Sequence, residues 1–381
     1  MRYNSMGNLF LVKFLIIIFF LSFPVLLFAA PYGPVDRNTV YDRLYESDLV
    51  LYGKILRKTK DDKGGAMTEF EVYNNIKGGI WKKGDFFYLN ETLNQPVNTI
   101  GILYAYRSVR NGVNFYELNV FYPDKNARIY NYTKKIYDFL TSGDNEGRLR
   151  WLYSQVDSNN SFIAWDSYAE LGLASYEDLK KAAPAIDRES LIYLTGLAGV
   201  QDHRKSFYVF LLGLARNKVD LPFVKRIIEN PSNKDSKILY GAFMAYGLLS
   251  DNYPEYFLKK MNSPASRNLK LAVLEAVKNL MLYERPKNVQ PMLKSLYAAL
   301  KSGDDKLIFR AVQISRELKI PGPMKYMRAI YFNNFADNPI GRIEVINYLK
   351  IVRKITPDAV KLLEEIKKKE KNPKVRSKVD Y

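Results

Sequence analysis

The chain has 381 residues, enough for two domains, and its 47% hydrophobic and 26% charged residues are typical of a folded globular protein. It contains no cysteine and a single histidine, His203. This composition excludes disulfide bonds and a cysteine nucleophile, and it leaves too few Cys and His ligands for a zinc site.

The formal net charge of +18 is unevenly distributed. Residues 31–125 contain 13 basic and 12 acidic residues, so most of the excess positive charge lies in residues 126–381. In an exported protein this excess favours acidic proteins, anionic glycans or lipid head groups as partners, and not nucleic acid. A lysine-rich solvated surface explains the excess equally well without any ligand.

Residues 1–30 are predicted to form a secretory signal peptide. Arg2 and Lys13 precede an uncharged apolar run, Phe14 to Ala30, which ends in small residues. The run is short for a membrane span, so we expect cleavage after Ala29, the alternative being an uncleaved anchor. The mature chain is then periplasmic or secreted and has no transmembrane span.

A Pro/Gly-containing linker leads into a β domain, which we place at residues 31–125. Alternating apolar residues bounded by turn residues predict five strands, at Leu49–Leu56, 67–79, Phe86–Glu91, Thr99–Arg107 and Val113–Phe121. Turns are predicted at Asp61–Gly65 and at the Asn111-Gly112 pair. Five strands over so short a stretch predict a small closed barrel.

The motifs SDLVLYGKI, TEFEVYNNIKG, KKGD and ILYAYRSVRNGVNFYEL resemble a bacterial family of exported OB-fold domains. That family is similar to the inhibitory domain of tissue inhibitors of metalloproteinases and to netrin-like modules. The resemblance implies an OB-like barrel. In those inhibitors an amino-terminal cysteine contacts the protease zinc, and the absence of cysteine here means that this mechanism is not implied.

Glycines and tyrosines of the β domain allow two interpretations. We expect Gly53 to mark a barrel kink and Gly78-Gly79 a turn, the alternative being close approach of the backbone to a ligand. Five tyrosines are expected in the core and rim, the alternative being a stacking face: Tyr52, Tyr88, Tyr104, Tyr106 and Tyr116.

From Tyr132 onward the apolar period becomes helical. Ten helices are predicted in five pairs: 203–216 with 220–229, 235–249 with 253–262, 265–282 with 286–300, 304–318 with 321–333, and 339–353 with 356–371. Repeats of this length predict an all-α, HEAT-like solenoid over residues 126–371, the alternative being an irregular bundle. FLLGLARNKVDLPFVKRIIENP and ILYGAFMAYGLL resemble the helical half of the same exported family. Residues 372–381 are predicted to be a flexible tail.

Candidate chemical groups are sparse. His203 lies beside Asp202, and as a general base it would need a positioned nucleophile such as Ser206 or Ser190. We interpret it as a surface histidine at a helix start. The acidic clusters at 144–146, 157–159 and 304–305 lack calcium-loop spacing and lie at predicted helix starts. We therefore predict no catalytic residue, no cofactor and no metal.

Basic pairs recur along the helices, at Lys180-Lys181, Arg204-Lys205, Lys225-Arg226 and Lys259-Lys260. If they share one face, they form an anion-binding stripe. The leading hypothesis is a non-enzymatic, exported cell-envelope scaffold that binds a protein partner. The alternatives are attachment to anionic glycan or lipid surfaces through the basic helical domain and, third, a protease inhibitor or hydrolase.

Overall fold

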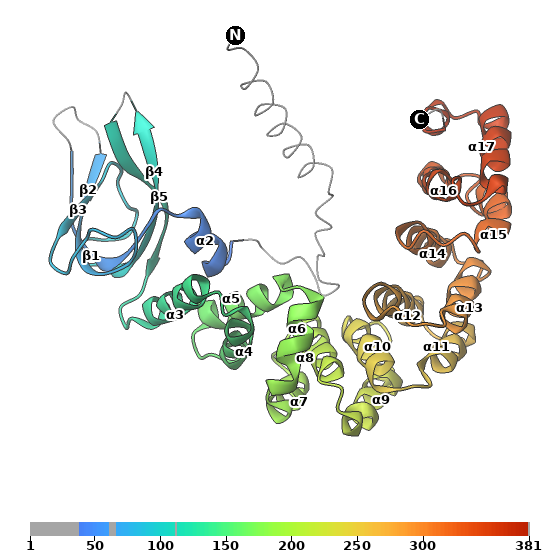
Figure 1. Cartoon of the computed structure of the whole chain (residues 1–381), viewed down its shortest axis with the longest axis horizontal. Helices are drawn as coiled ribbons and strands as arrows, with labels where there is room; N and C mark the ends of the chain where they lie inside the picture. The colour runs from blue at the N-terminus through green and yellow to red at the C-terminus, as the bar shows by residue number, and fades with distance from the viewer. Residues whose placement is uncertain (1–37, 61–65, 111–112, 380–381) are drawn as a thin grey trace, which may run out of the picture.

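The computed structural model describes residues 38–60, 66–110 and 113–379. The predicted signal peptide at 1–30, the linker up to residue 37 and the two predicted turns, Asp61–Gly65 and Asn111-Gly112, lie outside these residues. The described part comprises a β domain followed by a helical domain (Figure 1). The predicted boundary between residues 125 and 126 lies between the last strand and the first helix of the array.

The β domain is one antiparallel sheet with the strand order β3-β2-β1-β4-β5. Its five strands are those predicted from the sequence, although β1, β4 and β5 extend farther than expected and β2 and β3 end two residues earlier: β1 Leu49–Lys60, β2 Ala66–Lys77, β3 Phe86–Leu89, β4 Ile100–Arg110 and β5 Val113–Pro123. Bulges or irregularities interrupt the β1–β2 register in three places. Such irregularities increase the local twist of a sheet, so this one is strongly curved.

Both faces of the sheet are buried. Leu49 and Leu51 of β1 belong to one core of the β domain, together with Phe70 of β2. Val50 and Tyr52, which point to the opposite face, belong to a second core that continues through the helical domain. Because the two cores use alternate residues of β1, that strand is apolar on both faces, and the sheet is joined to the helices by packing.

A helix that the sequence did not indicate, α2 (Val40–Glu46), precedes the sheet. Thr39 caps it: its hydroxyl accepts from the backbone N–H of Asp42, and the Asp42 side chain accepts in return from the Thr39 backbone. Val40 and Leu44 are fully buried. Residues 40–46, just before the first strand, therefore form a helix that packs on the core.

The helical domain begins directly after β5. Its α-helices are α3 Arg128–Ser142, α4 Asn145–Gln155, α5 Ser161–Leu173, α6 Tyr176–Ala182, α7 Arg188–Gly196, α8 Asp202–Leu214, α9 Leu221–Glu229, α10 Ile238–Leu249, α11 Tyr253–Asn262, α12 Arg267–Asn279, α13 Gln290–Leu300, α14 Asp305–Glu317, α15 Met324–Ala329, α16 Pro339–Val352, α17 Pro357–Lys369 and α18 Pro373–Arg376. The ten helices predicted from residue 203 onward are confirmed, with ends that differ by a few residues. Two of them, α12 and α15, continue into π-helical segments, η4 Leu280–Glu284 and η5 Ile330–Asn334, which the periodicity did not indicate.

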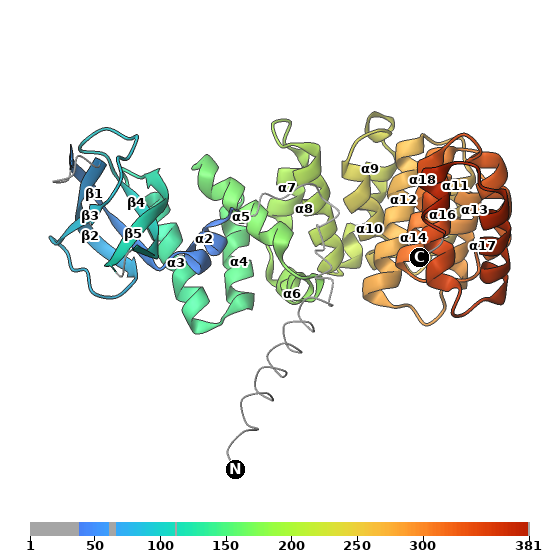
Figure 2. The ribbon, with the colours of Figure 1, turned by 90° about the horizontal axis from the view of Figure 1, so that it is seen from above.

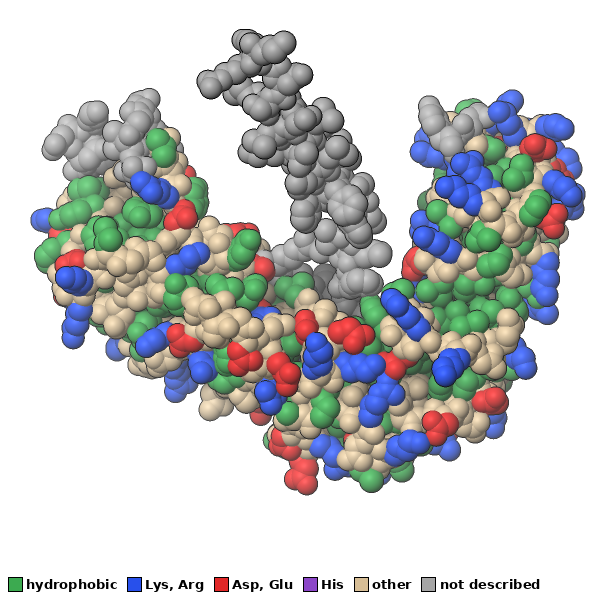
Figure 3. All heavy atoms as spheres, in the orientation of Figure 1, with side chains coloured by type: hydrophobic (Ala, Val, Ile, Leu, Met, Phe, Trp, Pro, Cys, Tyr) green, Lys and Arg blue, Asp and Glu red, His purple; other side chains and the backbone are tan. Residues whose placement is uncertain are grey.

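From α8 onward the helices form two rows along an arc (Figure 1). The inner row consists of α8, α10, α12, α14 and α16, each in contact with the next. The outer row consists of α9, α11, α13, α15 and α17 on the convex side. Seen from above, the β domain and α17 lie at opposite ends of the molecule (Figure 2). The space-filling view shows a hollow between these two arms (Figure 3).

The closest helix packing is between α8 and α10. A Cβ atom at Gly241 of α10 would lie 1.7 Å from the backbone oxygen of Ser206, and one at Gly213 of α8 would lie 2.5 Å from the Cα of Ala245. Only glycine allows this approach, because any side chain would collide with backbone. The buried hydroxyl of Ser206 also accepts from the Gly241 N–H at 2.8 Å, which aligns the two helices.

The end of the chain differs from the expectation. Residues 372–379, predicted as part of a flexible tail, contain α18, and Val375 is fully buried. Asn372 caps this helix through the backbone N–H groups of Lys374 and Val375, and Pro373 occupies its first turn. The basic composition of the tail concealed the two valines, Val375 and Val379, that pack it against the array.

Candidate binding surfaces at the domain joint and along the inner helices

Two carboxylates of α5 hold the first turn of α2 at the joint between the domains. The Val40 N–H donates to Asp166 at 2.8 Å, and the Tyr41 N–H donates to Glu170 at 3.0 Å. Asp166 and Glu170 lie four residues apart on one face of α5, and both are buried. A helix start has unpaired N–H groups and a partial positive charge, so it is a favourable partner for both anions.

The two carboxylates differ in their other partners. Asp166 accepts from the hydroxyl of Tyr132 at 2.8 Å and forms no ion pair with any residue that the structure describes. Burial, followed by repulsion from Glu170, raises its pKa to about 7. Burial also raises the pKa of Glu170, although the guanidinium of Arg148 donates to it and offsets part of that shift. The joint therefore contains two buried carboxylates: Glu170, whose charge is balanced by Arg148, and Asp166, whose charge is not balanced by a paired cation and which we call the uncompensated carboxylate.

Sequence reasoning missed this pair. The available signal was the segment FIAWDSYAELGLA, in which two acids four residues apart interrupt an otherwise apolar helix. Acids so placed are buried and need partners from elsewhere in the chain. Nothing in the sequence indicates that the partners come from Val40 and Tyr41, more than 120 residues earlier.

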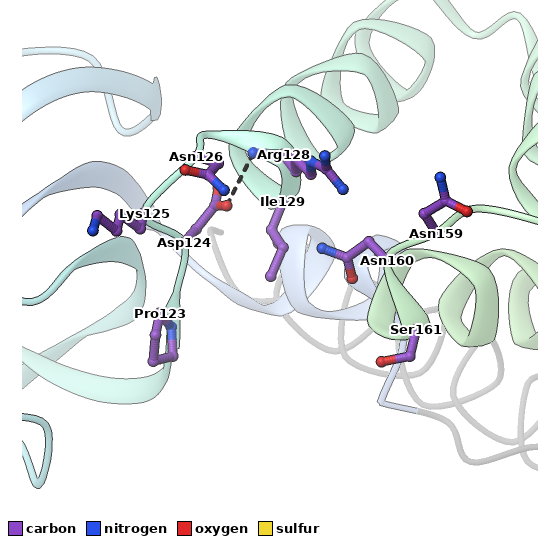
Figure 4. A pocket seen from close by; sticks show the side chains of 9 residues that line it. All are labelled: Pro123, Asp124, Lys125, Asn126, Arg128, Ile129, Asn159, Asn160 and Ser161. Atoms are coloured by element: carbon purple, nitrogen blue, oxygen red, sulfur yellow. Dashed lines mark hydrogen bonds between the residues drawn. The ribbon is translucent and has the colours of Figure 1, made fainter.

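A polar hollow of about 380 Å³ lies beside the joint, between the start of α3 and the start of α5 (Figure 4). Asp124 accepts there from the backbone N–H groups of Arg128 at 2.9 Å and Tyr130 at 2.7 Å. Asn160 caps α5 through the N–H of Phe162 at 3.0 Å. Figure 4 shows Lys125 pointing away from Asn160. The polar groups of this hollow are thus engaged in starting two helices.

An ion network covers the open side of α12 and α14 in the middle of the inner row. Arg310 donates to both carboxylate oxygens of Glu275, and Lys278 lies 3.1 Å from the same carboxylate. Arg310 and Lys278 also pair with Glu317, at 3.1 and 3.7 Å. Burial opposes ionisation of Glu275, but Arg310 and Lys278 outweigh it and lower the pKa of that carboxyl. The charges on this part of the concave face neutralise one another.

A second cluster bridges helices that are distant in sequence. The π-helical segment η4 positions Glu284 to accept from the Tyr176 hydroxyl at 2.5 Å, from the Lys180 ammonium at 3.0 Å and from Arg216. The rings of Tyr176 and Tyr283 stack with their centroids 4.5 Å apart. Burial raises the pKa of Glu284, but these three hydrogen bonds outweigh it and hold the pKa below its ordinary value. The cluster ties α6 directly to the end of α12.

His203 lies at the start of α8 with its ring against Tyr168, the centroids 5.7 Å apart. Burial, followed by Lys237 and Arg204, lowers its pKa below the ordinary value. Ser206 accepts from the Gly241 backbone, and Ser190 donates to Asp187 at 2.5 Å. Within the part of the chain that the structure describes, neither serine named as a possible nucleophile is hydrogen-bonded to His203.

The acidic clusters lie at helix starts. Asp144 caps α4, accepting from the Gly147 N–H at 2.8 Å. Asp304 caps α14 and pairs with Arg267 at 2.6 Å. Among the residues that the structure describes, no group of three or more His, Asp or Glu side chains is placed to hold a metal ion.

The β-domain candidates lie in two cores and on the surface. A Cβ at Gly53 would meet the backbone oxygen of Glu71 at 2.0 Å, so this glycine allows close approach of β1 and β2. Tyr52 and Tyr104 are buried in the core shared with the helices, whereas Tyr116 packs on the other core of the β domain. The two remaining tyrosines, Tyr88 and Tyr106, are exposed. The five tyrosines therefore form no single stacking face.

The basic pairs do not follow one row of helices. Arg204 is on α8 of the inner row, whereas Lys225-Arg226 and Lys259-Lys260 are on α9 and α11 of the outer row. Several of these cations have local partners. Lys180 pairs with Glu284, Arg204 donates to the carbonyl of Val156 at 2.9 Å, and Lys225 lies 4.0 Å from Glu229. The predicted stripe therefore has no continuous counterpart in these pairs.

Comparisons with models of protein families, with curated proteins and with solved structures found no match to this chain. Within the described ranges, no helix combines the length and apolar character needed to cross a membrane.

Proposed function

We propose that this protein is a non-enzymatic binding protein of the bacterial cell envelope, exported through residues 1–30, in which the β domain and the concave face of the helices bind a protein partner together. The observation that carries the proposal is the shared core. One continuous apolar cluster extends from Val50 and Tyr104 of the sheet to Val375 at the end of the array. A continuous core and the buried hydrogen bonds at the joint favour a fixed relative orientation of the two surfaces.

The finer architecture belongs to the same proposal. The β domain is an OB-like barrel, supported by the approach of β3 to β5. The rings of Phe87 and Tyr116 lie 5.6 Å apart, and the Leu118 N–H donates to the Glu91 side chain at 2.7 Å. The helical domain is a HEAT-like solenoid, supported by contacts between positions about one repeat apart, such as Arg267 with Asp304.

The concave face favours a protein over an anionic polymer as its partner. The two cations and two carboxylates of the ion network around Glu275 and Arg310 pair with one another, so this region has little net charge to attract an anionic polymer. Half-buried apolar side chains, Tyr240, Leu271 and Phe309, recur on successive inner helices. Aromatic and aliphatic side chains exposed beside satisfied polar groups are typical of protein-binding surfaces.

The test is affinity capture from envelope extracts with three forms of the protein. The wild type is compared with Leu271→Glu, which places a charge at a half-buried position of the inner row, and with Val219→Glu, which places the same charge at an exposed position in the turn after α8. Thermal unfolding checks that both variants remain folded. We expect partner capture to persist at about 1 M salt, where ionic attraction extends only about 3 Å, to be lost in Leu271→Glu and to be kept in Val219→Glu. Capture that disappears at high salt, or that Leu271→Glu leaves intact, contradicts the proposal.

A further inference from the structure

The connection between α16 and α17 combines exposed aliphatic side chains with exposed cations. Ile351, Ile355 and Val360 are 42%, 61% and 43% exposed. Arg353, Lys354 and Lys361 alternate with them in the segment IVRKITPDAVK, residues 351–361, and are also exposed. We call these six side chains the α16–α17 surface.

The surface belongs to the most basic part of the chain. Residues 350–379 contain eleven basic and four acidic residues. Three of the acids are already paired: Asp358 with Lys361, Glu365 with Arg328, and Glu370 with Arg342. Among the residues the structure describes, Arg353 and Lys354 form no ion pair. Figure 3 shows more Lys and Arg than acidic side chains on this arm of the molecule. Arg353 and Lys354 are therefore free to act on a partner, and the segment keeps a net positive charge.

The backbone holds the aliphatic groups outward. The N–H groups of Ile355 and Thr356 donate to the Val352 carbonyl at 2.9 and 3.0 Å, and Pro357 occupies the first turn of α17. Val352 is fully buried, so the turn is anchored on the core while Ile355 remains exposed. The apolar groups are thus in place before any partner arrives, and binding orders little backbone.

We infer that the α16–α17 surface docks on an anionic lipid bilayer. Aliphatic side chains can enter the boundary between head groups and acyl chains, and each nearby Lys or Arg adds attraction to anionic lipid. A protein interface fits less well, because such interfaces are enriched in Tyr, Trp and Arg and depleted in Lys. The inference is independent of the proposed partner-binding function, which uses the inner helices and the β domain.

The test is flotation of the purified full chain with vesicles of equimolar phosphatidylglycerol and phosphatidylcholine, and with vesicles of phosphatidylcholine alone. We expect wild-type protein to float with the anionic vesicles at low salt and not with the neutral ones. Ile355→Ser should weaken this binding about tenfold, because it removes most of one inserted side chain. Lys354→Glu should weaken it at least about fivefold, because it replaces an attraction with a repulsion.

Two matched controls separate the surface from general effects. Val219→Ser removes an aliphatic group of similar exposure, 64%, and Lys134→Glu reverses an exposed lysine of α3. Both should float like wild type, and thermal unfolding should show all four variants folded, because every changed side chain is exposed. Wild-type binding that is absent, equal on neutral vesicles, or unchanged in Ile355→Ser and Lys354→Glu overturns the inference. Binding to soluble polyglutamate without binding to vesicles also overturns it and assigns the surface to an acidic protein.

Discussion

The joint between the domains and the helical array are stabilised in different ways. At the joint, Asp166 and Glu170 bond to backbone groups 126 and 129 residues away, and their charges are buried. In the array, Lys218–Asp251, Arg267–Asp304 and Arg328–Glu365 join positions 33 to 37 residues apart, and they lie at the surface. The joint therefore depends on a few irreplaceable groups, whereas the array distributes its stability over many similar contacts.

The strongest test of this difference is Arg148→Met. Arg148 is 8% exposed and donates to Glu170, so its removal leaves a buried carboxylate without its cation. We expect a loss of about 3–5 kcal/mol in the free energy of unfolding, measured by denaturant titration. Adding Glu170→Gln should recover part of that loss, since the amide oxygen still accepts from the Tyr41 N–H. A loss of less than about 1 kcal/mol in Arg148→Met would show that the joint does not depend on this pair.

Gly241→Val tests the close contact between α8 and α10, where a side chain at residue 241 has no room. The new side chain would collide with the backbone of Ser206, so α8 and α10 must separate. We expect a loss of about 3 kcal/mol, measured as a lowered unfolding midpoint. Gly196→Ala is the control, because a Cβ there meets nothing within 4 Å. It should be neutral or slightly stabilising, as is usual when alanine replaces glycine in a helix. Equal losses in both variants would contradict the close approach of α8 and α10.

The uncompensated carboxylate at the joint predicts a dependence of stability on pH. The pKa of Asp166 is raised to about 7 in the folded protein. Between the unfolded pKa of about 4 and this value, the folded state binds the extra proton. The contribution of Asp166 to the free energy of unfolding is therefore largest at low pH, and between pH 4 and 7 it falls by about 1.4 kcal/mol per pH unit. Asp166→Asn should remove that slope in unfolding measurements between pH 5 and 8. An unchanged slope would show that another group causes it.

The smallest effect is expected at the exposed pair of Arg267 and Asp304. Arg267→Ala should cost less than about 1 kcal/mol, because surface ion pairs contribute little. Asp304→Ala should cost about 1 kcal/mol, because Asp304 also caps α14 through the N–H groups of Lys306 and Leu307. Thermal unfolding of the two variants distinguishes the roles. A larger loss in Arg267→Ala would mean that the array relies on surface charge.

The same difference explains how much the sequence could predict. Helices of the array follow from local signals, such as Asn338 before Pro339 at the start of α16, because their stabilising contacts are to neighbouring repeats. The strands can also be predicted from the local alternation of apolar and polar residues. This alternation is weak in β1, because Val50 and Leu51 point to opposite faces and belong to different cores. The joint could not be predicted, since Asp166 finds its partner in α2 only after the domains meet. The bridging hydrogen bond from Tyr176 to Glu284 could not be predicted either, because it also joins residues that are far apart in the sequence.

That bridge has a mechanical consequence. In a helical array where each repeat contacts only the next repeat, small rotations between repeats add up along the array, so the array as a whole can bend. Glu284 closes a loop of more than 100 residues by bonding to Tyr176 and Lys180, so the segment from α6 to η4 behaves as a braced frame. We expect this bridge to restrict bending between α6 and η4, so that the helices of this segment keep their orientation relative to one another when a partner binds.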